Sequence, residues 1–248
     1  MIDHVASRAL AGKVALVTGA GRGIGRAIAA AFARAGAATA CAARTLHETE
    51  ALAAEITAGG GVALALRADV TDAPAVDDMM ANTVRRFGGL DILVVNAGVN
   101  LSKSAVEDSD PTDWRATIET NLIGAYLCAR AAIPHLKQRG AGKIIMIGSG
   151  IGHRGAATRS AYACSKAGLW MLTRVLGQEL QEFNISVNEL MPGPVDTSMS
   201  VGGSVAAQQP GEWVKQPEDV VPLALFLASQ PDKGPTAQTF SLARRDVW

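Results

Sequence analysis

Tyr162 and Lys166 are the residues whose types and spacing first suggest chemistry. They stand four positions apart in "SAYACSK" (160–166), and in a helix that spacing stacks two side chains on one face. A free tyrosine loses its proton near pH ~10, and a nearby positive charge favours the phenolate and lowers that pKa. Such a tyrosine can exchange a proton with a substrate near neutral pH. The alternative is an ordinary surface pair, so the surroundings must decide.

Ser149 follows the apolar run "KIIMIG" (143–148), thirteen residues before Tyr162. At the end of an expected strand, its hydroxyl would be placed to orient a substrate oxygen. A serine at such a position is otherwise a cap or turn residue. The residue type and position alone leave both roles open.

Asn121 is the fourth candidate, and it lies in the helical pattern "DWRATIETNLIGAYL" (113–127). The apolar stripe of that pattern runs through Trp114, Ile118 and Leu122, which places Asn121 on or beside the buried face. A buried amide must find hydrogen-bond partners or cost about 1–3 kcal/mol. Asn121 therefore has either a structural or a catalytic reason to be there.

A glycine-rich turn, "TGAGRGIG" (18–25), follows an expected strand and opens an expected helix. It fits T-G-x-x-x-G-x-G through Gly19, Gly23 and Gly25, and departs from the strict G-x-G-x-x-G pattern. Glycines allow a tight turn and bring backbone N–H groups against a pyrophosphate. In this strand–turn–helix context the turn predicts a dinucleotide site.

The end of the second expected strand bears on the choice of dinucleotide. An acidic residue there would bind the ribose 2′-OH of NAD, but this chain has Ala43 followed by Arg44, and Arg22 lies in the glycine turn. A guanidinium can bind a 2′-phosphate in bidentate fashion. We therefore expect NADP(H) to be preferred, with NAD(H) possible. The alternative is that either arginine only faces solvent.

The elements that must position these residues alternate along the chain. The expected strands are 13–18, 38–43, 62–68, 90–96, 143–148 and 184–190. Helical patterns separate them, including 25–36, 47–58 and 73–88, and a helix at 217–229 is followed by one more short strand. This alternation predicts an α/β fold, with a parallel sheet covered by helices on both faces. Ligands then bind beyond the carboxyl ends of the strands, where the candidate residues fall.

The chain is expected to form a single domain, 1–248. Residues 197–216 are polar and glycine-rich and are predicted to be a mobile segment beside the substrate. The last residues, 236–248, form an atypical C-terminal tail.

Composition excludes several other classes of protein. The 248 residues are 48% hydrophobic and 19% charged, and 23 basic residues balance 23 acidic ones. This composition predicts a packed globular protein and gives no electrostatic case for nucleic acid or an anionic membrane. The three cysteines are far apart and the four histidines form no metal-ligand cluster, so we expect no metal, reduced thiols and a cytoplasmic location. No run approaches the ~18 apolar residues of a membrane helix.

Taken together, these motifs resemble the classical short-chain dehydrogenase/reductase family. The resemblance rests on "TGAGRGIG", "NAG" (96–98), the step from Ser149 to Tyr162, "YACSK" (162–166) and "NELMPGPVDT" (188–197), and it covers roughly residues 10 to 230. It implies a Rossmann-type doubly wound sheet of about seven strands, a nicotinamide cofactor and interconversion of alcohol and carbonyl groups.

The resemblance also implies roles for individual residues. Tyr162 would be the acid/base, with Ser149 orienting the substrate oxygen. Lys166 would lower the pKa of Tyr162 and hydrogen-bond the nicotinamide ribose. Asn121 would hold a water that links Lys166 to solvent, although a purely structural amide remains the alternative. The implied cofactor contacts are Gly19, Arg22, Gly23, Ile24, Gly25, Arg44, Asp69, Val70, Asn96, Ala97, Gly98, Tyr162, Lys166, Pro192, Gly193, Val195 and Thr197.

The substrate is the least determined part of the prediction. The loop between Ser149 and Tyr162 carries His153, Arg154 and Arg159. These side chains suggest a polar, hydroxylated small molecule, either neutral or anionic: a sugar, polyol or hydroxy-acid.

Two alternatives remain. One is a 3-oxoacyl-[acyl-carrier-protein] reductase. Pro134 and Gln178 stand where basic residues would dock the acidic carrier, but Arg130, Lys137 and Arg139 lie nearby. The other is a dinucleotide-sensing scaffold without activity. The resemblance also implies a homo-oligomer, either a tetramer or a dimer, which the atypical tail puts in question.

Overall fold

A seven-stranded parallel sheet forms the centre of the protein in the computed structural model, which describes residues 8–197 and 213–243. The strand order is β3-β2-β1-β4-β5-β6-β7, and each neighbouring pair is parallel. The strands are β1 (Val14–Thr18), β2 (Ala38–Ala43), β3 (Val62–Arg67), β4 (Ile92–Val95), β5 (Gly142–Ile147), β6 (Ile185–Met191) and β7 (Thr239–Ser241). The predicted doubly wound α/β fold is confirmed.

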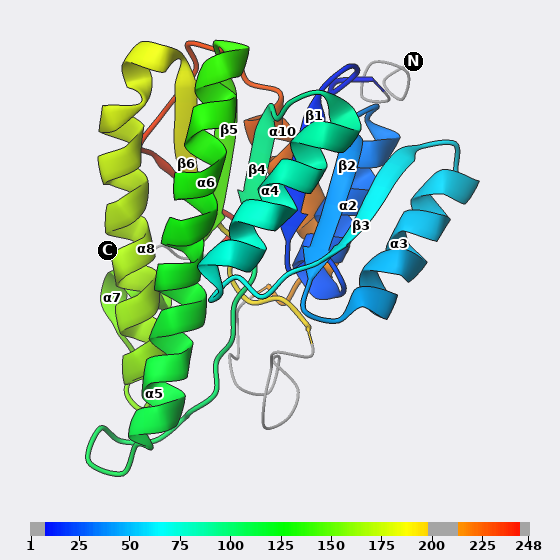
Figure 1. The fold of residues 1–248 in the computed structure, drawn as a ribbon. Coiled ribbons are helices and arrows are strands. Elements are labelled where there is room, and N and C mark those ends of the chain that lie inside the picture. The colour runs from blue at the N-terminus through cyan, green and yellow to red at the C-terminus, as the bar shows by residue number, and fades with distance from the viewer. Residues whose placement is uncertain (1–7, 198–212, 244–248) are drawn as a thin grey trace.

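Helices cover both faces of this sheet (Figure 1). One face carries α4 (Ala73–Phe87), α6 (Gly124–Arg139) and α8 (Ser160–Glu179), and the other carries α2 (Gly23–Arg34) and α10 (Val221–Ala228), with α3 (Leu46–Ala58) beside α2. The remaining short elements are α5 (Pro111–Ile118), α7 (Ile151–Arg154), a π-helical turn η1 (Glu119–Ile123), and two 3₁₀ turns, η2 (Gln181–Phe183) and η3 (Pro217–Val220). None of the described helices is long and apolar enough to cross a membrane.

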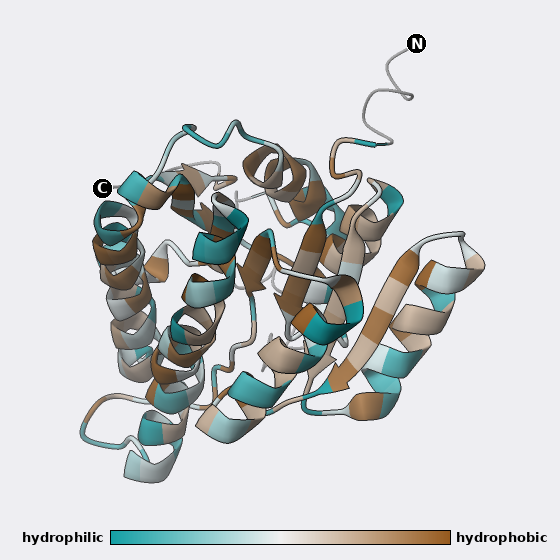
Figure 2. Cartoon of the chain, turned by 45° about the horizontal axis from the view of Figure 1, so that its top comes forward, coloured by the Kyte–Doolittle hydropathy of each residue, from teal (hydrophilic) through white to brown (hydrophobic). Residues whose placement is uncertain are grey.

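The core lies in two layers, one on each face of the sheet. One apolar cluster joins the strands to α2, α3 and α10, and the other joins them to α4, α6 and α8. Strands β1, β4, β5 and β6 are buried along their whole length, as the apolar runs predict. Strand β3 is half exposed because it forms the edge of the sheet. Figure 2 shows the brown central strands and the teal residues on the helices around them.

The helix expected around Asn121 is interrupted, which the sequence pattern did not predict. Helix α5 passes into the π turn η1 and then into α6. A π turn inserts a residue into the helical hydrogen-bond ladder. Asn121 lies inside this turn and is 1% exposed, which confirms that it faces the core.

Some sequence predictions fall wholly or partly outside the described residues. Of the predicted mobile segment 197–216, residues 198–212 are not described, and neither is the end of the tail, 244–248. The described part of the tail includes β7, which extends the sheet beside β6. The expectation of a single domain spanning 1–248 stays a prediction.

Thr18 joins the ends of β1 and β4, where the order of the strands reverses. Its hydroxyl accepts hydrogen bonds from the backbone N–H groups of Asn96 (3.0 Å) and Ala97 (3.1 Å) and donates to the carbonyl of Val94 (3.3 Å). The Asn96 amide in turn donates to the carbonyls of Thr18 (2.9 Å) and Gly19 (3.1 Å). This network sets the position of the glycine turn relative to the "NAG" segment.

Thr18→Val should lower the free energy of unfolding by about 2 kcal/mol, because it keeps the shape of the side chain but leaves buried N–H groups without an acceptor. Denaturant unfolding measures this. The matched control is Thr57→Val on the exposed side of α3, whose hydroxyl bonds only the carbonyl of Ala53, and which should change stability by less than about 0.5 kcal/mol. Equal effects of the two substitutions would contradict the assigned role of Thr18.

Candidate active site

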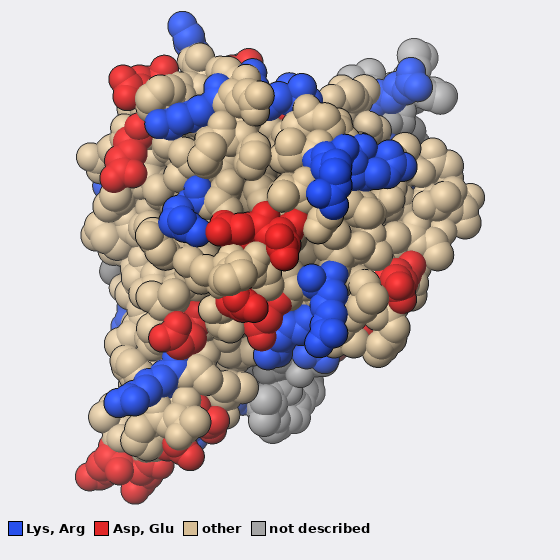
Figure 3. Space-filling view, in the orientation of Figure 1, with Lys and Arg blue, Asp and Glu red and all other residues tan. Residues whose placement is uncertain are grey.

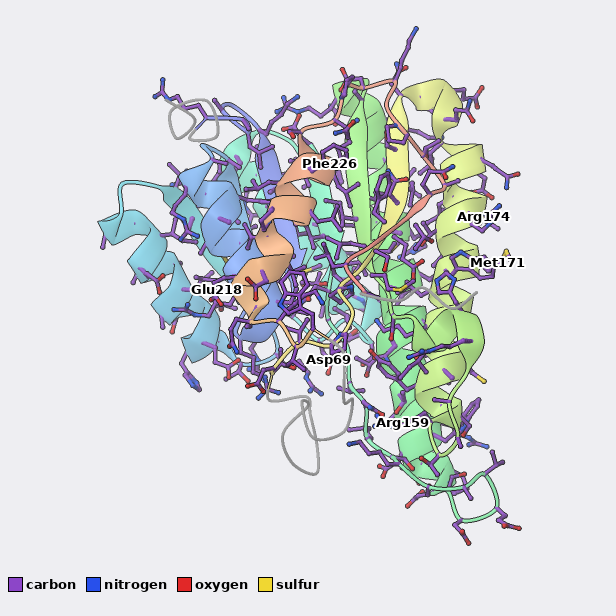
Figure 4. The ribbon with its side chains drawn as sticks, turned by 180° about the vertical axis from the view of Figure 1, so that it is seen from behind. Asp69, Arg159, Met171, Arg174, Glu218 and Phe226 are labelled. Atoms are coloured by element: carbon purple, nitrogen blue, oxygen red, sulfur yellow. The ribbon has the colours of Figure 1, made fainter. Side chains whose placement is uncertain are left out.

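A pocket of about 360 Å³ opens beyond the carboxyl ends of β1, β2, β3 and β4. This is the place where an open α/β sheet binds ligands. Its lining includes the following predicted cofactor residues: Gly19, Arg22, Gly23, Ile24, Arg44, Asp69, Val70, Asn96, Ala97, Gly98 and Thr197. Gly25, Pro192, Gly193, Val195, Tyr162 and Lys166 lie outside this lining. Figure 4 labels Asp69 near the base of the sheet on this side.

The glycine turn leaves no room for side chains at two of its positions. A Cβ on Gly19 would lie 2.8 Å from Asn96 Nδ2, and a Cβ on Gly25 would lie 2.4 Å from both Asn96 Nδ2 and the Gly19 carbonyl oxygen. Gly19 also has a φ of +64°, which favours glycine. The close approach of Gly25 to the turn brings the start of α2 against the pocket.

The N-terminus of α2 is suited to an anion. No side chain caps this helix, because its N-cap residue Arg22 makes no side-chain hydrogen bond to the first turn. Uncapped N–H groups at a helix N-terminus bind phosphate groups well. Asn100, which also lines the pocket, has its buried Oδ1 without a hydrogen-bond partner among the described residues. These features fit a dinucleotide.

The adenosine side of the pocket carries charges of both signs. Arg22 and Arg44 line it and are exposed, and Glu48 from the first turn of α3 lines it as well. The Glu48 carboxylate lies over the glycine turn, since a Cβ on Gly21 would come within 2.3 Å of its Oε2. Glu48 was not among the expected cofactor residues, although it is the first acidic residue after Arg44.

The segment 192–197 approaches the glycine turn from the other side. Gly193 has a φ of +67°, and Val195 pairs with Lys215 in an isolated parallel bridge. Thr197 comes close to the turn, because a Cβ on Gly23 would lie 3.4 Å from its Cγ2. Segments far apart in the sequence therefore meet around the pocket.

Tyr162 and Lys166 share one face of α8, as their spacing predicts. Lys166 Nζ lies 5.8 Å from the centroid of the Tyr162 ring and donates a hydrogen bond of 2.7 Å to the carbonyl of Ile147 at the end of β5. The side chain of Ser149, two residues beyond Ile147, acts on Tyr162 and lowers the pKa of its hydroxyl. The structure thus brings Ser149, Tyr162 and Lys166 together.

The expectation that Lys166 makes the Tyr162 phenol unusually acidic is wrong for the chain as the structure describes it. Burial raises the pKa of Tyr162, and the hydrogen bond from Ser149 and the positive charge of Arg159 only partly oppose this effect. Removing a phenolate from water disfavours it more than the nearby positive charge favours it. Tyr162 therefore holds its proton at neutral pH.

Lys166 is 5% exposed, and burial lowers its pKa to about 8. The negative charge of Glu189 acts in the opposite direction and raises it. Below pH 8 the side chain is mostly an ammonium group. Its charge is therefore sensitive to pH close to neutrality.

Asn121 is held by protein groups on both sides of its amide. Its Nδ2 donates to the carbonyl of Val99 (2.9 Å) and to Ser165 Oγ (3.0 Å), and its Oδ1 accepts from the Val99 N–H (2.7 Å). These bonds match the structural alternative for the side chain.

Among the described residues, His153 contacts Glu189 and Trp170, and its expected place on the substrate side stays a prediction. Its side chain is 4% exposed, its Nε2 lies 2.9 Å from Glu189 Oε2, and its ring packs 4.8 Å from that of Trp170. Arg154 is exposed, whereas Arg159 is half-buried at the start of α8 and acts electrostatically on Tyr162. Figure 4 labels Arg159 in this region.

Comparisons with known proteins agree with this geometry. A family model described as short chain dehydrogenase matches residues 13–205. The chain is 38% identical over 231 residues to trans-4-hydroxycyclohexanecarboxylate dehydrogenase of Sinomonas cyclohexanicum, which covers 89% of this chain and 87% of that protein. It is 35% identical over 245 residues to a 3-oxoacyl-[acyl-carrier-protein] reductase of a Synechocystis species, with 94% and 96% covered.

The fold comparison points the same way. The crystal structure of a short-chain type dehydrogenase/reductase from Mycobacterium marinum matches with a TM-score of 0.87 at 34% identity, covering 94% of each chain. The chain therefore belongs to the short-chain dehydrogenase/reductase family, and it is an NAD(P)-dependent oxidoreductase that acts on alcohol and carbonyl groups.

Proposed function

We propose that this protein is an NADP(H)-dependent oxidoreductase that interconverts a secondary alcohol and a ketone on a small, polar, anionic substrate such as a hydroxy-acid. The observation that carries the proposal is the geometry of Lys166, whose Nζ lies 5.8 Å from the centroid of the Tyr162 ring and is held by the carbonyl of Ile147, two residues before Ser149. A half-buried phenol, a nearby serine and a cation, in a chain whose glycine turn lines a pocket, fit hydride transfer coupled to proton transfer.

Each proposed catalytic residue has a distinct role in the reaction. The bound nicotinamide supplies or accepts the hydride. In the direction of reduction, Tyr162 donates its proton to the substrate oxygen, and its raised pKa means that the proton is present at neutral pH. Ser149 binds the same oxygen and orients the carbonyl. Lys166 holds a positive charge near the phenolate that remains and stabilises it.

Two exposed arginines support the preference for NADP(H). Arg22 and Arg44 line the pocket where the sheet places the adenosine ribose, and guanidinium groups bind phosphate in bidentate fashion. Glu48 lines the same part of the pocket and would repel a phosphate. The preference therefore rests on two cations against one carboxylate.

An anionic substrate is supported by the charge at the phenol. The positive charge of Arg159 acts on Tyr162 and lowers the pKa of its hydroxyl. A cation beside the proposed reaction centre is suited to a substrate carboxylate. The relatives named as dehydrogenases of cis- and trans-4-hydroxycyclohexanecarboxylate act on hydroxy-acids of this kind.

A 3-oxoacyl-[acyl-carrier-protein] reductase remains the second candidate, because relatives with that name share about a third of their residues with this chain. The charges on α6 do not favour it. Arg130 pairs with Asp77 (3.2 Å), Arg139 pairs with Asp91 (3.0 Å), and Lys137 Nζ lies 3.6 Å from the centroid of the Phe183 ring. Positive and negative side chains are interspersed on this side of the molecule (Figure 3).

Self-association and a cytoplasmic location remain part of the proposal. Exposed apolar side chains on η1, α6 and α8 support a homo-oligomer: Ile123, Tyr126, Met171 and Val175. Figure 4 places Met171 and Arg174 on the outer side of α8. A dinucleotide-sensing scaffold is disfavoured, because such a protein would not need a lysine held one helical turn from a half-buried tyrosine.

Tyr162→Phe should lower kcat by a factor of about 10²–10⁴, because it removes the proton donor and keeps the ring. NADPH binding, followed by fluorescence titration, should remain within about threefold of wild type, because the ring still packs in the same place. Tyr126→Phe, on the outer surface, is the matched control and should retain wild-type turnover. Appreciable turnover by Tyr162→Phe would contradict the proposed acid.

Arg44→Gln should weaken NADPH binding about tenfold, the loss of one charge-assisted contact to phosphate, and leave NADH binding nearly unchanged. Isothermal titration with both dinucleotides measures this. Arg85→Gln on α4, remote from the pocket, should affect neither. A wild-type protein that binds NADH more tightly than NADPH would refute the proposed cofactor preference.

Arg159→Gln should raise the KM for 4-oxocyclohexanecarboxylate at least about tenfold, because a substrate carboxylate loses a charged partner, and should leave the KM for uncharged cyclohexanone largely unchanged. Arg174→Gln, on the outer side of α8, serves as the control with the same loss of charge. Activity confined to uncharged ketones would count against an anionic substrate.

A further inference from the structure

A buried cluster of ionisable and polar side chains lies beside the proposed catalytic residues, and the mechanism above does not use it. Glu189 on β6 is fully buried, and His153 on α7 is 4% exposed. His153 Nε2 lies 2.9 Å from Glu189 Oε2, and Thr239 on β7 donates a hydrogen bond of 2.7 Å to the same oxygen. Three elements thus converge on one carboxylate in the core.

The second oxygen of this carboxylate has no hydrogen-bond partner among the described residues. Glu189 Oε1 is buried beside Gly148, and a Cβ on Gly148 would lie only 1.8 Å from it. Gly148 therefore has to be a glycine for the carboxylate to fit. A buried carboxylate oxygen without a donor is costly unless a nearby positive charge compensates it.

Lys166 is a positive charge on which Glu189 acts electrostatically. Its Nζ donates to the carbonyl of Ile147 at 2.7 Å, and Ile147 is bonded through its peptide group to Gly148, where Glu189 Oε1 lies. The Lys166 ammonium group and the Glu189 carboxylate therefore lie beside consecutive residues at the end of β5, and no hydrogen bond between them is found among the described residues. Helix α7 packs on the lysine itself, since a Cβ on Gly152 would lie 2.8 Å from Lys166 Cβ.

Other described charges do not explain the arrangement. The titratable groups that face Glu189 are His153 from α7 and Lys166 from α8, while β7 contributes the neutral Thr239. Helix α10, "VPLALFLA", contains no titratable residue. On β5, Lys143 sits at the opposite end of the strand and donates to the carbonyl of Pro231.

We propose that Glu189, held in place by His153 and Thr239, is a positioning residue of the active site whose buried negative charge keeps Lys166 in its ammonium form. The inference rests on the proposed roles of Tyr162 and Lys166. It adds that the charge of Lys166 is maintained from the interior of the sheet and does not depend on the substrate or on solvent.

The direction of the effect follows from the charges. Burial lowers the pKa of Lys166 to about 8 even with Glu189 raising it. Without the carboxylate, the pKa of Lys166 falls further, and the ammonium group loses its proton at a lower pH. Functions that need the ammonium, such as a hydrogen bond to the ribose of the cofactor and stabilisation of the Tyr162 phenolate, are then lost at a lower pH.

The test is Glu189→Gln, which has the same shape as glutamate and fits beside Gly148. The dissociation constant of NADPH is measured by fluorescence titration from pH 6 to 10, with NADH in a parallel series. We expect binding to weaken on the alkaline side with a midpoint near pH 8 in the wild type, and about one pH unit lower in the variant, the scale of one removed neighbouring charge. The alkaline limb of kcat/KM should shift in the same way.

Two variants separate charge from packing. Thr239→Val removes a hydrogen bond to Glu189, and His153→Gln replaces the imidazole with a neutral donor, yet both leave the carboxylate charge in place. Both should lower the melting temperature and keep the wild-type midpoint. A folded Glu189→Gln protein with an unchanged midpoint would overturn the proposal, because Glu189 would then be a neutral acid or a packing group.

The same shift in Thr239→Val or His153→Gln as in Glu189→Gln would also overturn it. If Glu189→Gln does not fold, Glu189→Met decides, because it removes the same charge without burying an unpaired amide: a midpoint about one pH unit lower supports the charge of Glu189, and an unchanged midpoint refutes it. Failure of the proposed function has a different signature, because it would appear as full activity in Tyr162→Phe while these midpoints could still shift.

Discussion

The removal of a phenol and an ammonium group from water is the constraint on which the rest of the site depends. Burial acts on both groups in the same sense, since it favours the neutral tyrosine and the neutral lysine. The pKa of Tyr162 is raised and that of Lys166 is lowered to about 8. The surrounding groups work against this tendency: Ser149 and Arg159 stabilise the phenolate, and Glu189 stabilises the ammonium.

Such a pair is only useful if it faces a bound dinucleotide, and we propose that the sheet arranges this. The pocket lies where β1 and β4 are neighbours and the chain turns to opposite sides of the sheet. Thr18 and Asn96 connect the two strand ends by hydrogen bonds, while Gly19 and Gly25 allow the backbone to approach them closely. The end of the adjacent β5 then provides both the carbonyl that receives Lys166 and the serine that meets Tyr162. Catalytic and binding groups thus share one framework.

The parts of this arrangement that sequence could predict are those governed by local rules. Alternating apolar runs and helical patterns predicted the parallel sheet, and the spacing of Tyr162 and Lys166 predicted their shared helical face. The apolar stripe around Asn121 predicted its burial. The stripe did not predict the π turn, because one extra residue in a helical turn does not alter the types of residue in the segment.

What sequence could not predict depends on contacts between distant segments. The contact between His153 on α7 and Glu189 on β6 joins residues 36 positions apart. The only signal for that pair was one charged residue in the expected strand "NISVNEL" (184–190). The pKa of Tyr162 was misjudged for the same reason. The spacing to Lys166 was visible in the sequence, whereas the desolvation that outweighs the lysine arises only when α8 packs on the sheet.

The most direct measurement of the central claim is a titration of the Tyr162 phenol itself. The chain contains only two tyrosines, so Tyr126→Phe leaves Tyr162 as the sole phenol, and its ionisation can be followed by ultraviolet difference absorbance against pH. The account predicts that the Tyr162 pKa lies above that of a free tyrosine in the protein alone and falls when oxidised NADP is added, because a positive charge then lies beside the phenol. An ordinary pKa that does not respond to the dinucleotide would contradict it.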